Sequence, residues 1–230
     1  MIDVIIPCYN AEQTLQQAVQ SVLNQAELGT LWIIDDASTD NTFALAKQFE
    51  AQVPHKIKVE QMPRNSGVAK ARNWGALQSD AEVIAFLDAD DAYENGALQV
   101  AEAIFHFRPE AMVVRRAFLL ACGGFPQYQL FRELGGEDGA LGIATTKISY
   151  VATAFTEAGV LHYCRDGMHA ERLLDAVLFN KHPENVTEEK MAQANAVTDN
   201  ICQQITALVH HLKQEQAGIY PLVLTREDIA

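Results

Sequence analysis

Short apolar runs alternate with segments whose apolar residues recur every three or four positions through the N-terminal part of the chain. A short apolar run predicts a buried strand, and the three-four spacing predicts a helix with one apolar face. The predicted strands cover residues 3–6, 31–34, 57–60 and 83–87, and the helices between them cover 15–23, 43–49 and 68–77. Pro7 is expected to end the first strand. This alternation favours an α/β fold with a mostly parallel, Rossmann-like sheet flanked by helices.

The pattern is less regular after the fourth strand. It predicts helices over 96–107 and 116–122, a helix that begins at 137, a helix over 170–179, and short strands over 112–114, 148–151 and 160–164. A longer helix opens at Thr187, and seven of its residues keep a three-four spacing: Met191, Ala194, Thr198, Ile201, Ile205, Leu208 and Leu212. Such a seam packs on another helix, either of this chain or of a second copy in a homodimer. We therefore expect a sheet domain over residues 1–168 and a helical extension over 169–230.

Composition and charge narrow the class of protein. Hydrophobic residues make up 49% of the chain and charged residues 20%, which is typical of a globular protein. No apolar run approaches the ~20 residues of a membrane-spanning helix, and no signal peptide is apparent, so we expect a cytoplasmic protein. The formal net charge of -13 argues against a nucleic acid partner, because phosphate binding depends on clustered Lys and Arg. The cysteines are scattered without a C-x-x-C pair, which favours reduced thiols over zinc ligands: Cys8, Cys122, Cys164 and Cys202.

Candidate ligand-binding residues follow each of the first four predicted strands: Pro7 and Tyr9, Asp35 and Asp36, Asn65 and Gly67, and Asp88 and Asp90. Ligands of open α/β sheets bind at the carboxyl ends of the strands, where these residues meet. The carboxylates of Asp88 and Asp90 repel each other unless a cation lies between them, so the D-x-D pattern predicts a divalent metal. An isolated D-x-D is more often a solvated turn, but four coincident strand ends favour a site. The Gly-rich dinucleotide fingerprint and the Walker-type loop are both missing after the first strand, which disfavours a nicotinamide dehydrogenase or an ordinary ATPase.

Four motifs occur in order along the first part of the chain: V-I-I-P-C-Y-N-A (4–11), I-I-D-D-A-S-T-D-N-T (33–42), N-S-G-V-A-K-A-R-N (65–73) and F-L-D-A-D-D (86–91). On these motifs the chain resembles the family 2 glycosyltransferases, which have the GT-A fold and use a nucleotide-sugar donor. The resemblance extends more loosely to G-G-F (123–125), E-D (137–138) and H-Y-x-R (162–165).

The resemblance implies roles for individual residues. Those implied to contact the nucleotide sugar are Pro7, Tyr9, Asp36, Asn65, Gly67, Arg72, Asp88 and Ala89. Among them, Asp36 suits a uracil base because a carboxylate accepts a hydrogen bond from the ring N–H, and Arg72 supplies a cation near the diphosphate. The alternative for Arg72 is an exposed helix arginine.

The resemblance also implies a metal site and a base. Asp88 and Asp90 would hold Mg or Mn, with Asp90 the stronger candidate for a ligand. Asp91 would support these ligands without binding the metal itself. His169 is a further candidate for a metal ligand or a phosphate contact, and a surface histidine is its alternative. Inverting transfer needs a base for the acceptor hydroxyl, which the E-D motif assigns to Asp138 first and Glu137 second. Because negative charge is also favoured at a helix start, a purely structural role for this pair is an open alternative.

The expected function is metal-assisted transfer of a single sugar from a UDP-sugar, with inversion, to an unknown acceptor. The acceptor is a glycan, a lipid-linked saccharide or a small molecule, and a lipid-linked one implies peripheral membrane contact. The region between the predicted helices at 96–107 and 116–122 is shorter than is usual in the family, and no Q-x-x-R-W pattern accompanies the core, so synthesis of an extruded polymer is not expected. The alternatives are a non-catalytic nucleotide-sugar-binding or scaffold protein and, on weaker grounds, a nucleotidyltransferase.

Overall fold

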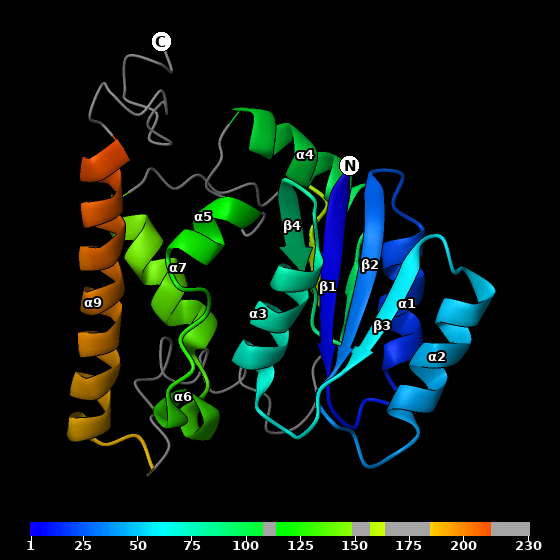
Figure 1. The fold of residues 1–230 in the computed structure, drawn as a ribbon, viewed down its shortest axis with the longest axis horizontal. Helices are drawn as coiled ribbons and strands as arrows, with labels where there is room; N and C mark the ends of the chain where they lie inside the picture. Colours follow the sequence, from blue (N-terminus) through cyan, green and yellow to red (C-terminus); the bar gives the residue numbers. More distant parts are fainter. Residues whose placement is uncertain (108–113, 149–156, 164–184, 213–230) are drawn as a thin grey trace.

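A five-stranded sheet with helices on both faces forms the centre of the protein (Figure 1). The structure is a computed structural model, and it describes residues 1–107, 114–148, 157–163 and 185–212. In chain order the elements are β1 (Ile2–Cys8), α1 (Leu15–Leu23), β2 (Leu28–Asp35), α2 (Thr42–Gln52), β3 (Ile57–Gln61), α3 (Val68–Gln78), β4 (Val83–Phe86), β5 (Asp91–Tyr93), α4 (Ala97–Phe107), β6 (Val114–Arg115), α5 (Arg116–Ala121), α6 (Gln129–Leu134), α7 (Glu137–Ile148), β7 (Val160–His162) and α9 (Glu188–Leu212).

The strand order in the main sheet is β3-β2-β1-β4-β6, with β6 antiparallel to β4 and the other four strands parallel. A second, two-stranded antiparallel sheet pairs β5 with β7. The predicted mostly parallel α/β sheet is therefore confirmed. Because the chain reverses its direction of winding between β1 and β4, a crevice is expected at the carboxyl ends of these two strands. That edge is the lower end of the sheet in Figure 1.

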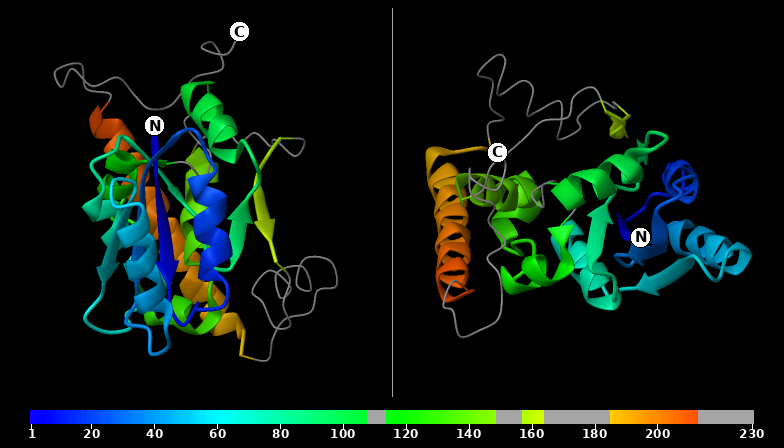
Figure 2. Two further views of the ribbon diagram at one scale, coloured as in Figure 1. Left: turned by 90° about the vertical axis from the view of Figure 1, so that its right-hand side faces the viewer. Right: turned by 90° about the horizontal axis from the view of Figure 1, so that it is seen from above.

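Two apolar layers enclose the sheet, and the alternation of side chains along β1 explains them. Val4 and Ile6 belong to the layer that includes residues of α1, α2 and α4. Ile5 points the other way, into the layer with residues of α3, α5, α7 and α9. Strands of a parallel sheet are covered on both faces, so β1 is buried at every position, and its sequence is apolar apart from Asp3. Figure 2 shows the helices on the two sides of the sheet.

The prediction that Pro7 ends the first strand is wrong, since β1 runs to Cys8 and pairs with β2 up to that residue. The carbonyl of Ile5 accepts a hydrogen bond from the Leu87 N–H (3.1 Å), so the backbone groups of every second residue along β1 face β4. Pairing between β1 and β4 has ended before Pro7 is reached. The missing N–H of proline therefore removes no ladder hydrogen bond.

The middle of the predicted helical seam packs within the chain, whereas Met191 at its start is exposed. Ile201 and Ile205 of α9 share an apolar cluster with Leu141 and Ala144 of α7, and Figure 1 shows the two helices side by side. Thr187 caps α9, because its Oγ1 accepts a hydrogen bond from the Lys190 N–H (3.3 Å). A homodimer through this helix stays a prediction.

Several predictions fall partly or wholly outside the described residues. Ile148 is the last residue of α7, so the strand predicted over 148–151 is wrong at its first residue, and the remainder is not described. The helix predicted over 170–179, the division between 168 and 169, and His169 also lie outside the described residues. In the part of the chain that is described, we find no helix both long and apolar enough to cross a membrane.

Candidate active site

A pocket of about 230 Å³ lies at the carboxyl ends of β1 and β4. Three segments line it, namely the end of β1 with the loop after it, the start of α3 and the acidic turn after β4: Pro7, Cys8, Tyr9, Asn10, Ala11, Thr14, Val68, Asp88, Ala89 and Asp90. The structure thus brings together five of the predicted site residues, from segments about eighty positions apart in the sequence, at the switch point of the sheet. Asp36, Asn65, Gly67, Arg72, Glu137 and Asp138 are not among the lining residues.

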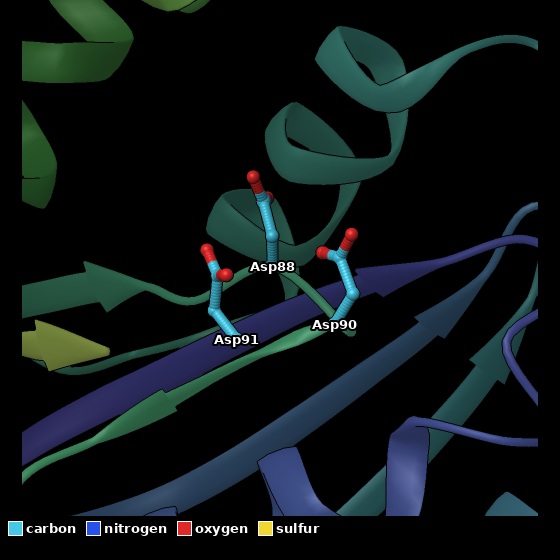
Figure 3. Close-up of side chains that lie close together, drawn as sticks. All are labelled: Asp88, Asp90 and Asp91. Carbon is cyan, nitrogen blue, oxygen red and sulfur yellow. The ribbon is translucent and has the colours of Figure 1, made fainter. Parts of the chain in front are cut away.

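Three carboxylates gather on the turn between β4 and β5 (Figure 3). Asp88, Asp90 and Asp91 each offer an oxygen, and these atoms all lie within 4.8 Å of one another. A hydrogen bond from the Asp91 N–H to the Asp88 carbonyl (3.1 Å) closes the turn that gathers them. Carboxylate oxygens at this spacing are the donor set that Mg and Mn prefer, so the residues fit a divalent cation. The sequence singled out the first two, and the structure adds Asp91 to the cluster.

Arg72 lies beside this cluster, on the inner side of α3. Its Nη2 donates to Oδ1 of Asp88 and its Nη1 donates to Oε1 of Glu137, both at 2.7 Å. The side chain is only 7% exposed, so the alternative of an exposed helix arginine is wrong. Burial by itself would lower the pKa of Arg72, but the neighbouring carboxylates outweigh burial and raise the pKa. The guanidinium therefore keeps its positive charge between the two acidic residues.

Glu137 and Asp138 open α7, and their environments differ. Glu137 is buried, and its carboxylate is engaged with Arg72. Asp138 is exposed, and its Oδ1 accepts a hydrogen bond from the N–H of Gly139 (2.7 Å). Both carboxylates also lie where a helix dipole favours negative charge. Only the second is presented to solvent, where an acceptor hydroxyl could reach it.

Asp36 holds a loop in place. Its two carboxylate oxygens accept hydrogen bonds from the backbone N–H groups of Ser66 and Gly67, each at 2.7 Å. Gly67 has a φ of 92°, which favours glycine, and it comes directly before α3. The predicted base-binding role of Asp36 stays a prediction, and the structure shows a second task for this carboxylate, which is to place the start of α3.

Asn65, in the same loop, contacts a different part of the chain. Its Oδ1 accepts a hydrogen bond from Nη2 of Arg132 (2.8 Å), at an exposed position on α6. The arginine side chain also lies close over Gly67, where an added Cβ would stand 3.2 Å from Nε of Arg132. The loop after β3 is thus held by Asp36, which follows β2, and by Arg132 of α6.

The loops that follow β1 and β2 are braced against each other. Asn10 accepts from the Thr39 N–H (2.8 Å), and the Ala11 N–H donates to Oγ1 of Thr42 (2.7 Å). Asp40 accepts from the N–H groups of Glu12 (3.3 Å) and Thr42 (2.9 Å). Partial burial tends to raise the pKa of Asp40, but these hydrogen bonds outweigh it and lower the pKa from the usual 3.8. The brace fixes one wall of the pocket.

The sequence reasoning missed the role of Asn73. Its side-chain amide donates to the Phe125 carbonyl (2.9 Å), and its Oδ1 accepts from the Phe125 N–H (2.8 Å). Gly124 allows this approach, since an added Cβ there would lie 2.4 Å from Oδ1 of Asn73. The Phe125 ring in turn packs 5.3 Å from the Arg72 guanidinium. The available signal was that Asn73, at the end of N-S-G-V-A-K-A-R-N, and the G-G-F motif both belong to family motifs and had no assigned role.

The described cysteines are free thiols, as predicted. Burial raises the pKa of Cys122 to about 11. Burial, and then the charge of Asp35, raise the pKa of Cys8 above its usual range. Cys8 lines the pocket, but a protonated, buried thiol is a poor nucleophile.

Comparison with known proteins identifies the family. The model of glycosyl transferase family 2 matches residues 3–164, which is most of the chain. This protein belongs to glycosyltransferase family 2. It is 39% identical over 105 residues to the minor teichoic acid biosynthesis protein GgaA of Bacillus subtilis, a match that covers 43% of this chain and 23% of GgaA. It is also 39% identical over 104 residues to the poly(ribitol-phosphate) beta-N-acetylglucosaminyltransferase TarP of Staphylococcus aureus, covering 43% of this chain and 31% of TarP. The chain thus spans less than half the length of these relatives.

Solved structures share the fold of this glycosyltransferase. The mannosyltransferase PcManGT from Pyrobaculum calidifontis, in complex with GDP-Man and Mn2+, aligns with a TM-score of 0.63 at 17% identity, over 96% of this chain and 76% of that one. S. aureus TarS in complex with UDP-GlcNAc aligns with a TM-score of 0.59 at 19% identity, over 99% of this chain and 77% of that one. The predicted GT-A type of fold is confirmed.

Proposed function

We propose that this glycosyltransferase moves a single sugar from a UDP-sugar to an acceptor hydroxyl with inversion, assisted by Mn or Mg. The observation that carries the proposal is the position of the acidic cluster, since Asp88 and Asp90 line a pocket at the switch point of the sheet. The complexes of TarS with UDP-GlcNAc and of PcManGT with GDP-Man and Mn2+ support a nucleotide-sugar donor and a divalent cation. The cytoplasmic location stays a prediction.

The donor would lie across the strand ends. Pro7 and Tyr9 form the wall available to the nucleoside, and the exposed ring of Tyr9 (47%) offers an apolar face to it. Asp88 and Asp90, with Asp91 behind them, would hold the cation next to the donor diphosphate. When bound, the cation neutralises the charge that builds on the departing nucleoside diphosphate.

The transfer step needs a nucleophile and a proton acceptor. The acceptor oxygen forms a bond to the anomeric carbon while the bond from that carbon to the diphosphate oxygen breaks, and the hydroxyl proton passes to a carboxylate. Asp138 is the better base of the E-D pair, because Glu137 is buried and its oxygen is already engaged with Arg72. Glu137 instead holds the start of α7.

Calorimetric titration with UDP, with and without Mn2+, tests the proposal. We expect UDP to bind more tightly with Mn2+, and Asp90→Asn to abolish that gain. Asp80→Asn is the matched control, because it removes an exposed carboxylate that precedes β4 at the opposite end of the strand. Equal UDP affinity with and without Mn2+, or an Asp90→Asn variant that behaves like the control, would show the metal assignment to be wrong. UDP binding without UDP release across an acceptor panel would favour the alternative, a non-catalytic donor-binding protein.

A further inference from the structure

Arg72 contacts two segments that the proposed reaction uses for different purposes. Asp88 belongs to the turn after β4 at the cation cluster, and Glu137 is the first residue of α7, next to the proposed base Asp138. The two bonds span 16 and 65 positions of the sequence, each at 2.7 Å. One guanidinium thus contacts both the cation cluster and the start of α7 directly.

The surroundings of Arg72 fix the geometry of this link. The side chains of Arg72 and Glu137 are each 7% exposed, whereas that of Asp88 is 45% exposed. The Phe125 ring packs against the guanidinium, and Nε of Arg72 is buried with no hydrogen-bond partner among the residues that the structure describes. A planar fork with two fixed acceptors has one orientation, so a change at either carboxylate is felt at the other.

We propose that Arg72 is a positioning residue that couples the cation site to the start of α7. The inference rests on the proposed function for its cation and its base. Asp88 is shared between Arg72 and the cation, and Glu137 draws the guanidinium towards α7. How strongly Arg72 competes with the cation for Asp88 therefore depends on Glu137, and by reciprocity the cation biases the position of α7.

The coupling predicts effects of opposite sign. Neutralising Glu137 leaves the charge of Arg72 to Asp88 alone, which weakens cation binding. Neutralising Arg72 removes the competing cation, which strengthens binding while leaving Asp88 and Glu137 without the group that orients them. General loosening of the site would instead weaken cation binding in both variants.

The test is Mn2+ alone titrated into the full chain without nucleotide, with free Mn2+ followed by electron paramagnetic resonance. Compared with wild type, we expect Glu137→Gln to raise the Kd for Mn2+ roughly fivefold. Arg72→Gln should lower the Kd roughly tenfold while slowing UDP release from a UDP-sugar. In the double variant the effect of Glu137→Gln should disappear, because it acts through Arg72. Asp80→Asn is again the control.

Any other result of the Mn2+ titration would overturn either the coupling alone or the metal assignment together with it. If Mn2+ binds wild type and is lost in Asp90→Asn, but Glu137→Gln matches the control, the coupling is wrong and the proposed function stands. An undiminished effect of Glu137→Gln in the Arg72→Gln background would mean a through-space charge effect and would also overturn the coupling. If wild type binds no Mn2+, the metal assignment and the coupling both fail. If Arg72→Gln does not fold, the isosteric Glu137→Gln is compared with the control alone, with circular dichroism checking its fold: an unchanged Kd overturns the coupling, and a roughly fivefold rise supports it.

Discussion

The part of the molecule proposed to bind the donor, β1 to β5 (the donor half), is held together differently from the part proposed to face the acceptor, which comprises α5, α6, α7 and α9 (the acceptor half). In the donor half, strand pairing and the loop brace between Asn10 and Thr39 fix the pocket wall locally. The acceptor half consists of helices separated by glycines in the left-handed region, namely Gly123, Gly124, Gly135 and Gly136. An apolar cluster packs α5, α7 and α9 against the sheet and α3, and a few polar side chains add directed contacts.

Those side chains come from α3 and the loop before it. Arg72 donates a hydrogen bond to Glu137, and Asn73 donates one to the backbone carbonyl of Phe125. Asn65 accepts a hydrogen bond from Arg132. The first two contacts are buried and the third is exposed. The comparison indicates that one helix of the donor half places the acceptor half, so variants of α3 should affect both the assembly and the transfer rate.

Replacing the proposed base, Asp138, should have the largest effect, because it should change the rate of transfer without changing donor binding. Asp138→Asn should lower the rate of sugar transfer by about 10²- to 10⁴-fold, the usual contribution of general base catalysis. The affinities for Mn2+ and UDP should stay at wild-type values, because Asp138 is outside the pocket lining. UDP release from a UDP-sugar measures the rate, and calorimetry measures binding. An Asp138→Asn variant with normal turnover would remove Asp138 from the mechanism and leave the donor site unaffected.

The buried contact between Asn73 and Phe125 should contribute more to the free energy of unfolding than the exposed contact between Asn65 and Arg132. Asn73→Ala leaves the N–H and carbonyl of Phe125 without their partner, so the free energy of unfolding should fall by about 2–4 kcal/mol. Asn65→Ala removes one exposed hydrogen bond to Arg132 and should change it by less than about 1 kcal/mol. Urea unfolding followed by circular dichroism compares the two variants. Equal losses would mean that burial does not distinguish these contacts.

The smallest expected effect is on stability, and it concerns Asp40 in the brace between the loops after β1 and β2. This effect depends on pH. The pKa of Asp40 is lowered in the folded protein, so its contribution to stability is present above the usual value of 3.8 and is lost as pH falls through the lowered folded value. Asp40→Asn should therefore destabilise the protein at about pH 7, and its difference from wild type should be smaller at about pH 3, below the usual pKa of 3.8. Urea midpoints at the two pH values measure this. A gap that stays constant with pH would show that the charge of Asp40 contributes nothing, and Asp80→Asn provides the exposed control.

The sequence predicted the sheet well because each early strand and helix carries its own periodic pattern. The four parallel strands, the helices that cover them and the acidic turn at Asp88 were all found in this way. Pro7 was misjudged, because the direction in which its backbone faces depends on where a neighbouring strand ends. The strand prediction was wrong at Ile148 because a short apolar run fits a strand or a helix equally well. Ile148 belongs to α7, and that helix packs against α9.

By itself, the sequence determined the α/β class, the edge of the sheet that holds the site and the identity of its acidic residues, since these follow from local periodicity and from motifs within single segments. Only the tertiary structure decided that Arg72 is buried between Asp88 and Glu137, that Asp36 holds the loop at Gly67, and that Asn73 clamps Phe125. These contacts join segments far apart in the chain, and their geometry depends on how helices pack across the sheet, which no local pattern encodes.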